Sequence, residues 1–355
     1  MKRLTYCYPI MKNVSFKLIA EKHIEHLKGR YIIYRVDVDN LRILRLLPTN
    51  YVILHPLFYP FWYCWERDYE LMYQINKIKS TICEKIVAFD TADSDRLSSK
   101  AVDIANYLPD VVVVPSEYAR NTYVDSGVCK DKVRVIPHGV SDIFFDNSIV
   151  IRSVMRKIAS DSRKKILYFI THSFYRKGAD LVEKAINELR KRRKDFVLIC
   201  KTSNLMLENN WSRKNCDYVI SGLLSDEEIK TLYDISDLLI LPSRGGGFEL
   251  NGLEALMRNR PVIYPKESCI EEYAGKVVPE LGVKIASRPT VLQGNKIHVG
   301  RGHEVDLNDF IDKINYALDN IDELKEKVRT RFTREMRERY RWGNIANEII
   351  KVLES

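Results

Sequence analysis

The sequence predicts an α/β protein made of two Rossmann-like domains, each built on a parallel sheet. Three observations support this fold class. Short runs of aliphatic and β-branched residues alternate with amphipathic segments along most of the 355-residue chain. The runs are almost continuously apolar, which is typical of parallel strands that helices cover on both faces. The length also suits two cores of ordinary size better than one.

The first half of the chain shows the alternation clearly. The strands predicted there are Leu4–Tyr8, Tyr31–Val36, Tyr51–Leu54, Lys85–Phe89, Val111–Pro115 and Val133–Ile136. The helices predicted between them are Phe16–Leu27, Ser98–Tyr107 and Glu117–Ser126. We therefore assign residues 1–148 to an N-terminal Rossmann-like domain.

The most apolar stretch runs from Val52 to Trp65 and is too short to span a bilayer. We expect a buried strand that leads into an aromatic loop. The alternative is that the loop contacts a membrane surface, because aromatic side chains favour that interface. The aromatic residues concerned are Phe58, Tyr59, Phe61, Trp62 and Trp65.

The second half repeats the pattern. Its predicted strands are Ile166–Ile170, Phe196–Cys200, Tyr218–Ile220, Leu238–Leu241 and Pro261–Tyr264. Its predicted helices are Ala179–Arg192, Asp226–Ile235 and Leu250–Arg258, and Ser225 with Glu228 forms a capping box at the start of the second. We assign residues 149–335 to a C-terminal Rossmann-like domain and residues 336–355 to a helix that crosses back to the N-terminal domain.

Charge and cysteine content narrow the choice of partners and compartment. The formal charge of +9 favours acidic partners such as phosphates, nucleotides or anionic lipid. The seven cysteines are scattered and never spaced as C-x-x-C, so we expect neither a disulfide framework nor a zinc site. No signal peptide is visible, and we expect a cytoplasmic protein, with peripheral contact at the inner membrane surface as an open option.

Polar residues gather where the predicted strands end, which is where open parallel sheets bind ligands. In the first half these residues are Lys12, Asn13, Asp90, Asp93, Ser94 and Ser116. In the second half they are His172, Ser173, Arg176, Lys177, Ser243 and Arg244. We expect the two sheets to face each other with these ends across a cleft.

The loop from Arg244 to Glu249 is the most informative segment, since it holds three consecutive glycines before a predicted helix. Glycines let the backbone approach a ligand closely, and a helix N-terminus favours an anion such as pyrophosphate. Arg176 and Lys177 also stand at a helix N-terminus, where they oppose the dipole unless an anion binds there. Glu254, one turn into the glycine-loop helix, can accept hydrogen bonds from vicinal hydroxyls.

An ordered set of segments makes the chain resemble the retaining GT-B glycosyltransferases of family 4, also called glycosyl transferases group 1. The segments are Val114–Tyr118, Ile136–Val140, Arg176–Gly178, Ser221–Ser225, Leu241–Ser243, Gly247–Leu250 and Leu253–Leu256. The resemblance implies the GT-B architecture and a hexosyltransferase-type enzyme. It implies that residues 1–148 form the acceptor domain and that residues 149–335 form the nucleotide-sugar-binding domain. It also implies a UDP- or GDP-linked sugar as co-substrate, retention of configuration, and neither cofactor nor metal.

The resemblance also assigns roles by position. Lys177 matches the lysine that neutralises the donor phosphates, and Glu254 matches the second glutamate of a Glu-x7-Glu pair, which holds the ribose. The first glutamate falls on Gly246, so Glu249 is the candidate for the missing carboxylate. An arginine of the family matches His172, which leaves phosphate charge to Arg176. The remaining donor contacts expected are Ser173, Gly222, Gly247, Phe248 and Leu250.

In the N-terminal domain, Asp90 and Asp93 are the candidates for a residue near the reacting carbon. Lys12, Asn13 and Ser94 are expected on the acceptor side, and the acceptor itself stays open between a glycan, a protein and a lipid-linked molecule.

The sequence also allows other interpretations of the protein's function. Asp37-Val38-Asp39 and Asp93-Ser94-Asp95 match the D-x-D pattern of metal-dependent transferases of another fold, although so short a pattern arises easily by chance. A nucleotide-sugar epimerase, a phosphorylase or an inactive binder can share the scaffold. A basic nucleic-acid-binding protein is the alternative from another class, but the sequence offers no recognition helix, zinc finger or aromatic RNA platform. We therefore expect no nucleic-acid partner.

Overall fold

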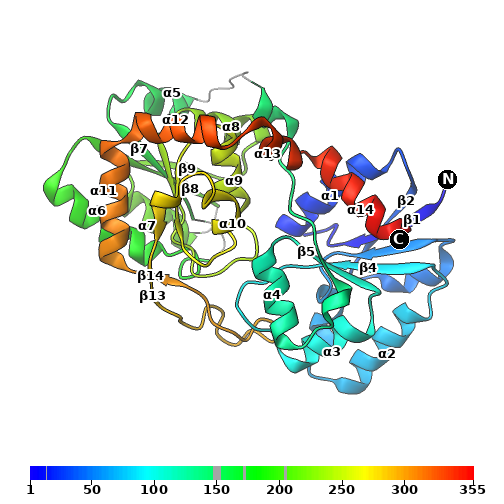
Figure 1. Ribbon diagram of the computed structural model, residues 1–355. Helices are drawn as coiled ribbons and strands as arrows, with labels where there is room; N and C mark the ends of the chain where they lie inside the picture. Colours follow the sequence, from blue (N-terminus) through cyan, green and yellow to red (C-terminus); the bar gives the residue numbers. More distant parts are fainter. Residues whose placement is uncertain (13, 147–152, 171–172, 204–205) are drawn as a thin grey trace. The chain divides into compact units, whose positions relative to one another are not determined.

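The computed structural model describes residues 1–12, 14–146, 153–170, 173–203 and 206–355. The chain divides into two compact units (Figure 1). The first unit contains Met1–Gly139, Leu292–Gly300 and Arg339–Ser355, and the second contains Val140–Val291 and Arg301–Glu338. The chain therefore leaves the second unit after Val291 to add a short segment to the first unit, and then returns.

The first unit is built on a six-stranded parallel sheet with the strand order β2-β1-β3-β4-β5-β6. Its strands are β1 (Arg3–Tyr8), β2 (Ile32–Asp37), β3 (Tyr51–Leu54), β4 (Lys85–Phe89), β5 (Val111–Val114) and β6 (Val133–Val135). All the strands predicted in this half are confirmed to within two residues at each end.

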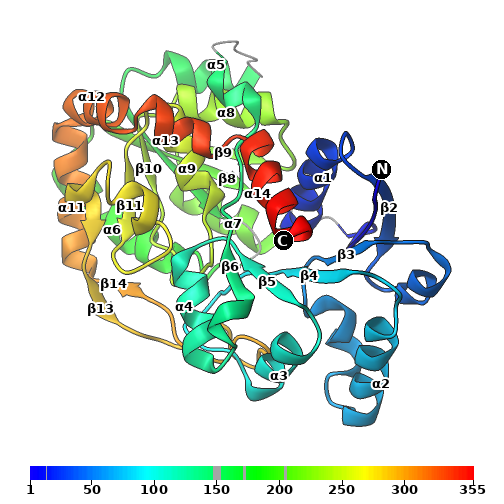
Figure 2. The ribbon, with the colours of Figure 1, turned by 45° about the vertical axis from the view of Figure 1, so that its right-hand side comes forward.

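Helices cover both faces of this sheet, as Figures 1 and 2 show. On one face lie α1 (Ser15–Leu27) and α14 (Trp342–Glu354), and on the other lie α2 (Asp68–Lys79), α3 (Ser99–Tyr107) and α4 (Glu117–Ser126). Leu4, Tyr6 and Tyr8 of β1 belong to the core on the α1 and α14 side, while Cys7 belongs to the opposite core. This alternation is what a strand buried on both faces requires. The short helices of this unit are η1 (Leu41–Leu46), η2 (Tyr59–Cys64) and η3 (Lys130–Lys132).

The second unit has its own six-stranded parallel sheet, in the order β12-β11-β10-β7-β8-β9. Its strands are β7 (Lys164–Ile170), β8 (Phe196–Thr202), β9 (Tyr218–Ser221), β10 (Leu238–Ile240), β11 (Val262–Pro265) and β12 (Gly282–Val283). A two-stranded antiparallel pair, β13 (Ile285–Ser287) and β14 (Glu304–Val305), lies beyond them in the chain.

The helices that follow the strands of the second unit agree with the prediction where one was made. They include α6 (Ala179–Arg192), α8 (Asp226–Asp234) and α9 (Leu250–Met257), and the Ser225–Glu228 capping box is confirmed. The other helices here and toward the C-terminus are α5 (Ser153–Ser160), α7 (Met206–Asn215), α10 (Glu271–Ala274), α11 (Leu307–Asp319), α12 (Ile321–Arg331) and α13 (Arg334–Arg339), with η4 (Asp142–Phe145) and η5 (Pro279–Leu281).

Each sheet has one point at which the strand order reverses direction. In the first unit the reversal lies between β1 and β3, and in the second it lies between β7 and β10. Loops leaving two such strands diverge to opposite faces of a sheet and open a crevice at its carboxyl edge. The topology therefore marks one candidate ligand site in each unit.

The aromatic loop after β3 is largely packed inside the first unit. Phe58, Phe61 and Trp65 are buried, whereas Trp62 and Tyr63 are exposed. The predicted buried strand is thus confirmed, and the aromatic loop after it packs the rings of Phe58, Phe61 and Trp65 inside the unit. No helix among the described residues is long and apolar enough to cross a membrane.

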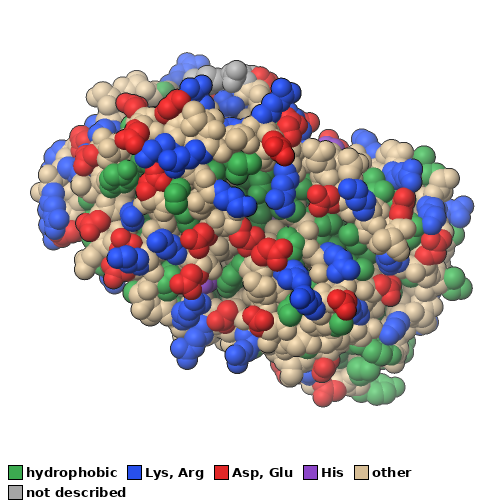
Figure 3. All heavy atoms as spheres, in the orientation of Figure 1, with side chains coloured by type: hydrophobic (Ala, Val, Ile, Leu, Met, Phe, Trp, Pro, Cys, Tyr) green, Lys and Arg blue, Asp and Glu red, His purple; other side chains and the backbone are tan. Residues whose placement is uncertain are grey.

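Two features of charge and cysteine chemistry are visible in the structure. On the face shown in Figure 3, basic and acidic side chains are interspersed, so the net charge of +9 does not form one basic patch there. A disulfide joins Cys200 to Cys216, which the sequence analysis did not foresee. The helix between β8 and β9 returns the chain so that the two Cα atoms lie 6.0 Å apart, within the usual disulfide range, although the residues are 16 apart in sequence.

Candidate active site

The reversal point of the second unit brings together the two loops that sequence analysis singled out. β7 and β10 are adjacent parallel strands, so the loops that follow them begin side by side. The Arg176 guanidinium donates a hydrogen bond to the carbonyl of Gly245 (3.1 Å), and the Arg244 amide donates to the carbonyl of Arg176 (2.7 Å). Gly178 has a left-handed φ of 74°, and a Cβ there would lie 2.3 Å from the carbonyl oxygen of Pro242. The two loops are therefore locked to each other by their backbones.

Lys177 and Glu249 form a buried ion pair at this junction. The Lys177 Nζ atom lies 2.6 Å from Glu249 Oε1 and 2.7 Å from Oε2, and both residues are more than 90% buried. The Tyr273 hydroxyl donates to the Glu249 carbonyl (2.7 Å), which fixes the backbone just before α9. A Cβ at Gly246 would lie 2.8 Å from Glu249 Oε1. The Glu249 carboxylate therefore occupies the space that a side chain at position 246 would enter.

Arg244 holds the surrounding loops in place. Its side chain is only 1% exposed and donates to both carboxylate oxygens of Asp180 (2.7 Å each), to Glu304 (2.8 Å) and to the carbonyl of Tyr175 (2.7 Å). Burial by itself would raise the pKa of Asp180, but the hydrogen bonds and charge of Arg244 bring it below its ordinary value. One buried cation thus ties the start of α6 to strand β14 and to the loop that carries Lys177.

Glu254 lies one turn into α9, where its carboxyl accepts a hydrogen bond from the Tyr233 hydroxyl (2.9 Å). Burial raises the pKa of Glu254 to about 8, the Tyr233 bond opposes this rise, and the charge of Asp226 adds to it. The raised pKa means that this carboxyl keeps its proton to higher pH than a free glutamate, and in the protonated form it can both donate and accept a hydrogen bond.

The other predicted donor contacts lie at several places in the second unit. Gly222 has a left-handed φ of 88° and accepts a hydrogen bond from Lys201 Nζ (2.6 Å). The carbonyl of Ser173 accepts from the Lys177 amide (3.0 Å). The Phe248 ring packs against that of Tyr273, with centroids 5.8 Å apart, and Leu250 begins α9. Gly247 is buried beside them, and His172 lies outside the described residues.

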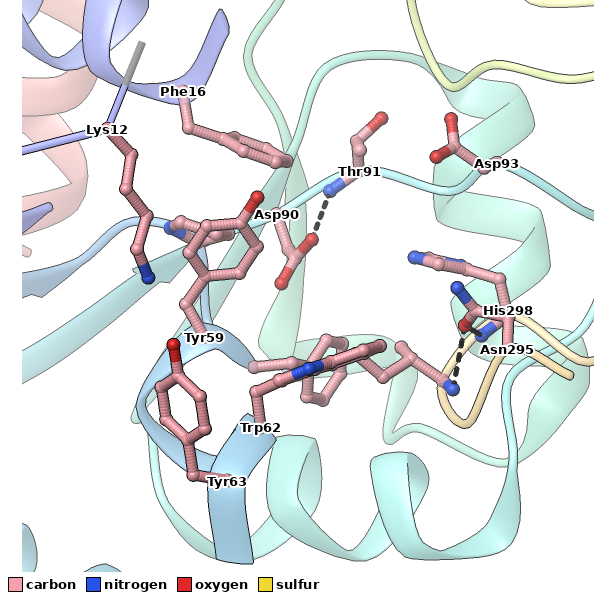
Figure 4. Close-up of a pocket in the computed structure, with 13 residues that line it drawn as sticks. Lys12, Phe16, Tyr59, Trp62, Tyr63, Asp90, Thr91, Asp93, Asn295 and His298 are labelled. Atoms are coloured by element: carbon pink, nitrogen blue, oxygen red, sulfur yellow. Dashed lines mark hydrogen bonds between the residues drawn. The ribbon is translucent and has the colours of Figure 1, made fainter. Parts of the chain in front are cut away.

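The reversal point of the first unit carries a cavity of about 380 Å³, within the roughly 300–1,000 Å³ typical of small-molecule sites. Figure 4 shows the cavity walls. Lys12 and Phe16 come from the segment after β1, Tyr59 and Trp62 from the segment after β3, and Asp90 from the end of β4.

Asp90 is the buried carboxyl of this cavity. Only 6% of its surface is exposed. Oδ1 accepts a hydrogen bond from the Thr91 amide (2.8 Å), whereas Oδ2 is buried and has no hydrogen-bond partner among the residues the structure describes. Burial raises the pKa of Asp90 to about 7; nearby backbone amides limit the rise and the charge of Asp93 adds to it.

The remaining predicted acceptor-side residues have different positions. Lys12 lines the cavity and pairs with Asp39 (3.1 Å), and Asp93 also lines it. Ser94 is fully buried; its hydroxyl donates to the Arg96 carbonyl (3.2 Å) and accepts from the Gly300 amide (3.1 Å). Its side chain therefore anchors the inserted segment rather than lining the cavity. Asn13 lies outside the described residues.

No group of three or more His, Cys, Asp or Glu side chains among the described residues is arranged to hold a metal ion. Asp37, of the first D-x-D match, instead accepts backbone hydrogen bonds from Asp39 and Met11.

Comparison with known proteins agrees with this geometry. Residues 150–283 match the family model "Glycosyl transferases group 1", and residues 223–349 match "Family 4 Glycosyltransferase in conflict systems". Anabaena HepE, solved in complex with UDP and glucose, shares the fold with a TM-score of 0.68, at 13% identity and with 100% of both chains covered. The protein is a glycosyltransferase with the GT-B fold, and its residues 150–283 are similar to the group 1 family.

Two viral proteins are similar to this glycosyltransferase over most of its length. "Uncharacterized protein 356" of Sulfolobus islandicus rod-shaped virus 1 is 29% identical, over 99% of this chain and 98% of that protein. "Putative glycosyltransferase 45" of Sulfolobus islandicus filamentous virus is also 29% identical, over 76% of this chain and 74% of that protein. Neither name specifies a donor or an acceptor, so both substrates have to be argued from the residues.

Sequence reasoning missed one wall of the glycosyltransferase's first-unit cavity. Asn295 and His298 line it from the segment Leu292–Gly300, which the chain inserts from far along the sequence. No periodic pattern in that segment signals the contact. It also missed the structural role of Arg244, because the carboxylates that bind it lie 60 or more residues away.

Proposed function

We propose that the glycosyltransferase moves a hexose from a UDP- or GDP-linked donor to an acceptor hydroxyl, with retention and without a metal. The observation that carries the proposal is the meeting of Arg176, Lys177 and Glu249 with the N-terminus of α9 at the reversal point of the second unit. Cations together with the backbone amides of a helix N-terminus stabilise a doubly charged leaving group.

The donor diphosphate is proposed to bind between Lys177 and the start of α9. Lys177 supplies a charge that is already desolvated, and the amides before and within the first turn of α9 supply hydrogen bonds. Both are fixed in advance by the interlocked loops, so little reorganisation is needed as negative charge develops on the β-phosphate. Arg176, held on the Gly245 carbonyl, adds a second positive charge.

Glu249 is proposed to take the place of the carboxylate that the family carries at position 246. Its Oε1 atom reaches the space directly beside Gly246 from three residues further along the chain. Its backbone lies at the N-cap of α9 but makes no side-chain capping bond, so the carboxylate is turned toward Lys177 instead. We assign it to the hydroxyls of the donor sugar, and we assign Glu254, oriented by Tyr233, to the ribose.

The proposed reaction breaks the bond between the sugar C1 and the β-phosphate oxygen and forms a bond from C1 to the acceptor oxygen. The leaving nucleoside diphosphate keeps the electron pair of the broken bond. With retention, the acceptor proton passes to an oxygen of the departing phosphate. Asp90 and Asp93 of the first unit are assigned to positions near the reacting carbon, and Lys12 to the acceptor side.

A donor screen tests the proposal. The full chain is incubated with UDP-, GDP- and ADP-sugars, and thermal stability and slow hydrolysis are followed. We expect one base to raise the melting temperature in a concentration-dependent way, since a ligand that binds only the folded state stabilises it. Stabilisation by none of these donors, together with no release of nucleoside diphosphate, would refute the transferase proposal.

A carboxylate swap tests the assignment of Glu249. Glu249→Ala should lower turnover at least tenfold, because it removes a carboxylate from the donor sugar and leaves Lys177 buried without its partner. Gly246→Glu in that background should recover a large part of the activity. The backbone at Gly246 lies outside the left-handed region, and the shortened residue 249 leaves room for the new side chain.

Glu326→Gln on the exposed surface of α12 is the control for the swap and should leave turnover unchanged. If Gly246→Glu fails to improve a folded Glu249→Ala variant, the carboxylate at 249 does not replace the one at 246.

A further inference from the structure

The cavity of the first unit has the features of a binding site in its own right. It lies at the reversal point between β1 and β3, where the loops after these strands separate, and it measures about 380 Å³. The Oδ2 atom of Asp90 is buried there without a partner, and such an atom normally has one in a folded protein. Figure 4 shows the Asp90 carboxyl pointing into the space between the wall of Tyr59 and Trp62 and the wall of Asn295 and His298.

One wall is aromatic and partly exposed. Phe16 packs edge-on against Tyr59, with ring centroids 5.5 Å apart, and Trp62 keeps 43% of its surface accessible. Rings of this kind offer a flat apolar face at low cost in conformational entropy. A sugar ring carries C–H groups on one face that match such a surface.

The opposite wall is polar, and its hydrogen-bonding capacity is only partly used. Asn295 Oδ1 accepts from the amides of Ile297 (2.9 Å) and His298 (2.8 Å). Within the described part of the chain, its Nδ2 group has no protein partner and is available as a donor. Together with Asp90 Oδ2 as an acceptor, this gives a pair of complementary groups for neighbouring hydroxyls.

This polar wall is held firmly by the body of the first unit. The Val299 amide donates to the Arg96 carbonyl (3.0 Å), and the Ser98 amide donates to the Ile297 carbonyl (2.9 Å). Ile297 is buried in the core beneath the cavity. The segment is thus a fixed part of the cavity, as a determinant of specificity must be.

The charges of the cavity disfavour an anionic ligand. Lys12 is the only lysine or arginine among the described residues that line it, and it is already paired with Asp39. Asp90 and Asp93 both line the same space. A phosphate group would meet the buried Asp90 Oδ2 acceptor, which a second acceptor cannot satisfy, whereas a hydroxyl group can donate to it.

We propose that this cavity binds a neutral saccharide as the acceptor, with Trp62 and Tyr59 against a ring face and Asp90 and Asn295 on its hydroxyls. The proposal rests on the proposed function, since it names the acceptor of the same transfer. It selects a glycan over a phosphorylated lipid or a nucleic acid. It also makes the inserted segment Leu292–Gly300 the part of the chain that selects the acceptor.

Binding to the full chain tests the proposal directly. The probes are methyl glycosides of glucose, galactose, mannose and N-acetylglucosamine, with the hexose 1-phosphates and dodecyl phosphate as anionic alternatives. Saturation-transfer NMR and calorimetry measure their binding without a donor. We expect saturable binding of at least one neutral glycoside and at least tenfold weaker binding of the anionic probes.

Two variants locate the binding. Trp62→Ala should weaken glycoside binding at least tenfold by removing the ring face. Asn295→Asp keeps the oxygen that holds the Ile297 and His298 amides but removes the donor, so it should weaken binding with the fold intact. Tyr69→Ala is the matched control, because Tyr69 is an exposed aromatic residue on α2 that does not line the cavity.

The possible results separate this proposal from the proposed function. Absence of glycoside binding, preference for the anionic probes, or binding that neither cavity variant weakens would overturn the saccharide assignment, while nucleotide binding in the second unit stays measurable. Nucleoside diphosphate affinity should be unchanged in Trp62→Ala and Asn295→Asp. A glycoside that binds well to a protein that recognises no nucleotide sugar would instead contradict the transferase proposal alone.

Discussion

The two sheet-reversal points of this glycosyltransferase occupy equivalent places in their sheets but differ in chemistry. In the second unit the crevice is filled by charges that compensate one another: Lys177 with Glu249, and Arg244 with Asp180 and Glu304. In the first unit the crevice is an open cavity with aromatic walls around Asp90. Topology thus places a site at each sheet edge, and the side chains decide what the site can hold.

The difference also appears in two individual carboxyls, Asp180 beside Arg244 and Asp90 in the cavity. Asp180 accepts two hydrogen bonds from the Arg244 guanidinium, which lower its pKa although desolvation opposes this. Asp90 forms no ion pair with any residue that the structure describes, and burial raises its pKa to about 7. A charged, interlocked crevice suits a diphosphate, and a crevice with an uncompensated carboxyl suits neutral hydroxyl groups.

The largest effect is expected where the charged crevice loses its central cation. Arg244→Met should reduce the free energy of unfolding by about 3–5 kcal/mol, because it leaves two partly buried carboxylates without their partner. Urea denaturation of the second-unit transition measures this. Arg329→Met, which breaks an exposed pair with Glu326, is the control and should change stability by less than about 1 kcal/mol. A loss as small as that for Arg244→Met would show that the loops are held by other contacts.

The next effect concerns the uncompensated carboxyl of the open cavity. The pKa of Asp90 is raised from 3.8 to about 7 in the folded protein. The folded state therefore binds this proton more tightly than the unfolded chain, and the carboxyl costs stability progressively as pH rises through this interval. Asp90→Asn removes that dependence. Relative to the wild type, its unfolding free energy should improve by about 2–3 kcal/mol between pH 5 and pH 8.

Denaturation at several pH values measures the Asp90 effect as a difference between variant and wild type, so that other titrating groups cancel. Asp93, Tyr59 and Lys12 face the same cavity and are unchanged in the variant. Asp103→Asn, on the exposed side of α3, should show no such trend. A difference that is flat with pH would mean that the Asp90 carboxyl is better solvated than its burial implies.

A third prediction concerns the function of the charged crevice. Lys177→Ala should lower kcat/KM about 10- to 150-fold, which corresponds to roughly 1.5–3 kcal/mol of charge-assisted bonding. Steady-state kinetics with the preferred donor measures it, and Lys184→Ala on the exposed face of α6 serves as the control. Near-normal turnover in a folded Lys177→Ala protein would remove this lysine from the mechanism.

Much of the fold followed from local patterns. The strands from β1 to β11 and the helices α6, α8 and α9 were predicted because burial on both faces and capping leave a signal in consecutive residues. The approach of Lys177 to the glycine loop also followed, since both loops leave the carboxyl ends of strands in one parallel sheet. The segment Leu292–Gly300, the Arg244 clamp and the Cys200–Cys216 disulfide carry no local signal, because each depends on partners brought close only by folding.

The amino-acid sequence alone determined the alternation of strands and helices, the family resemblance and the residues that follow each strand, because these depend on neighbours along the chain. The tertiary structure decided that Glu249 fills the space beside Gly246, that Arg244 is enclosed by carboxylates, and that Asn295 stands across a cavity from Trp62. Hydrogen bonds, ion pairs and cavities depend on distances in space, and those distances are set only when the sheets and helices pack.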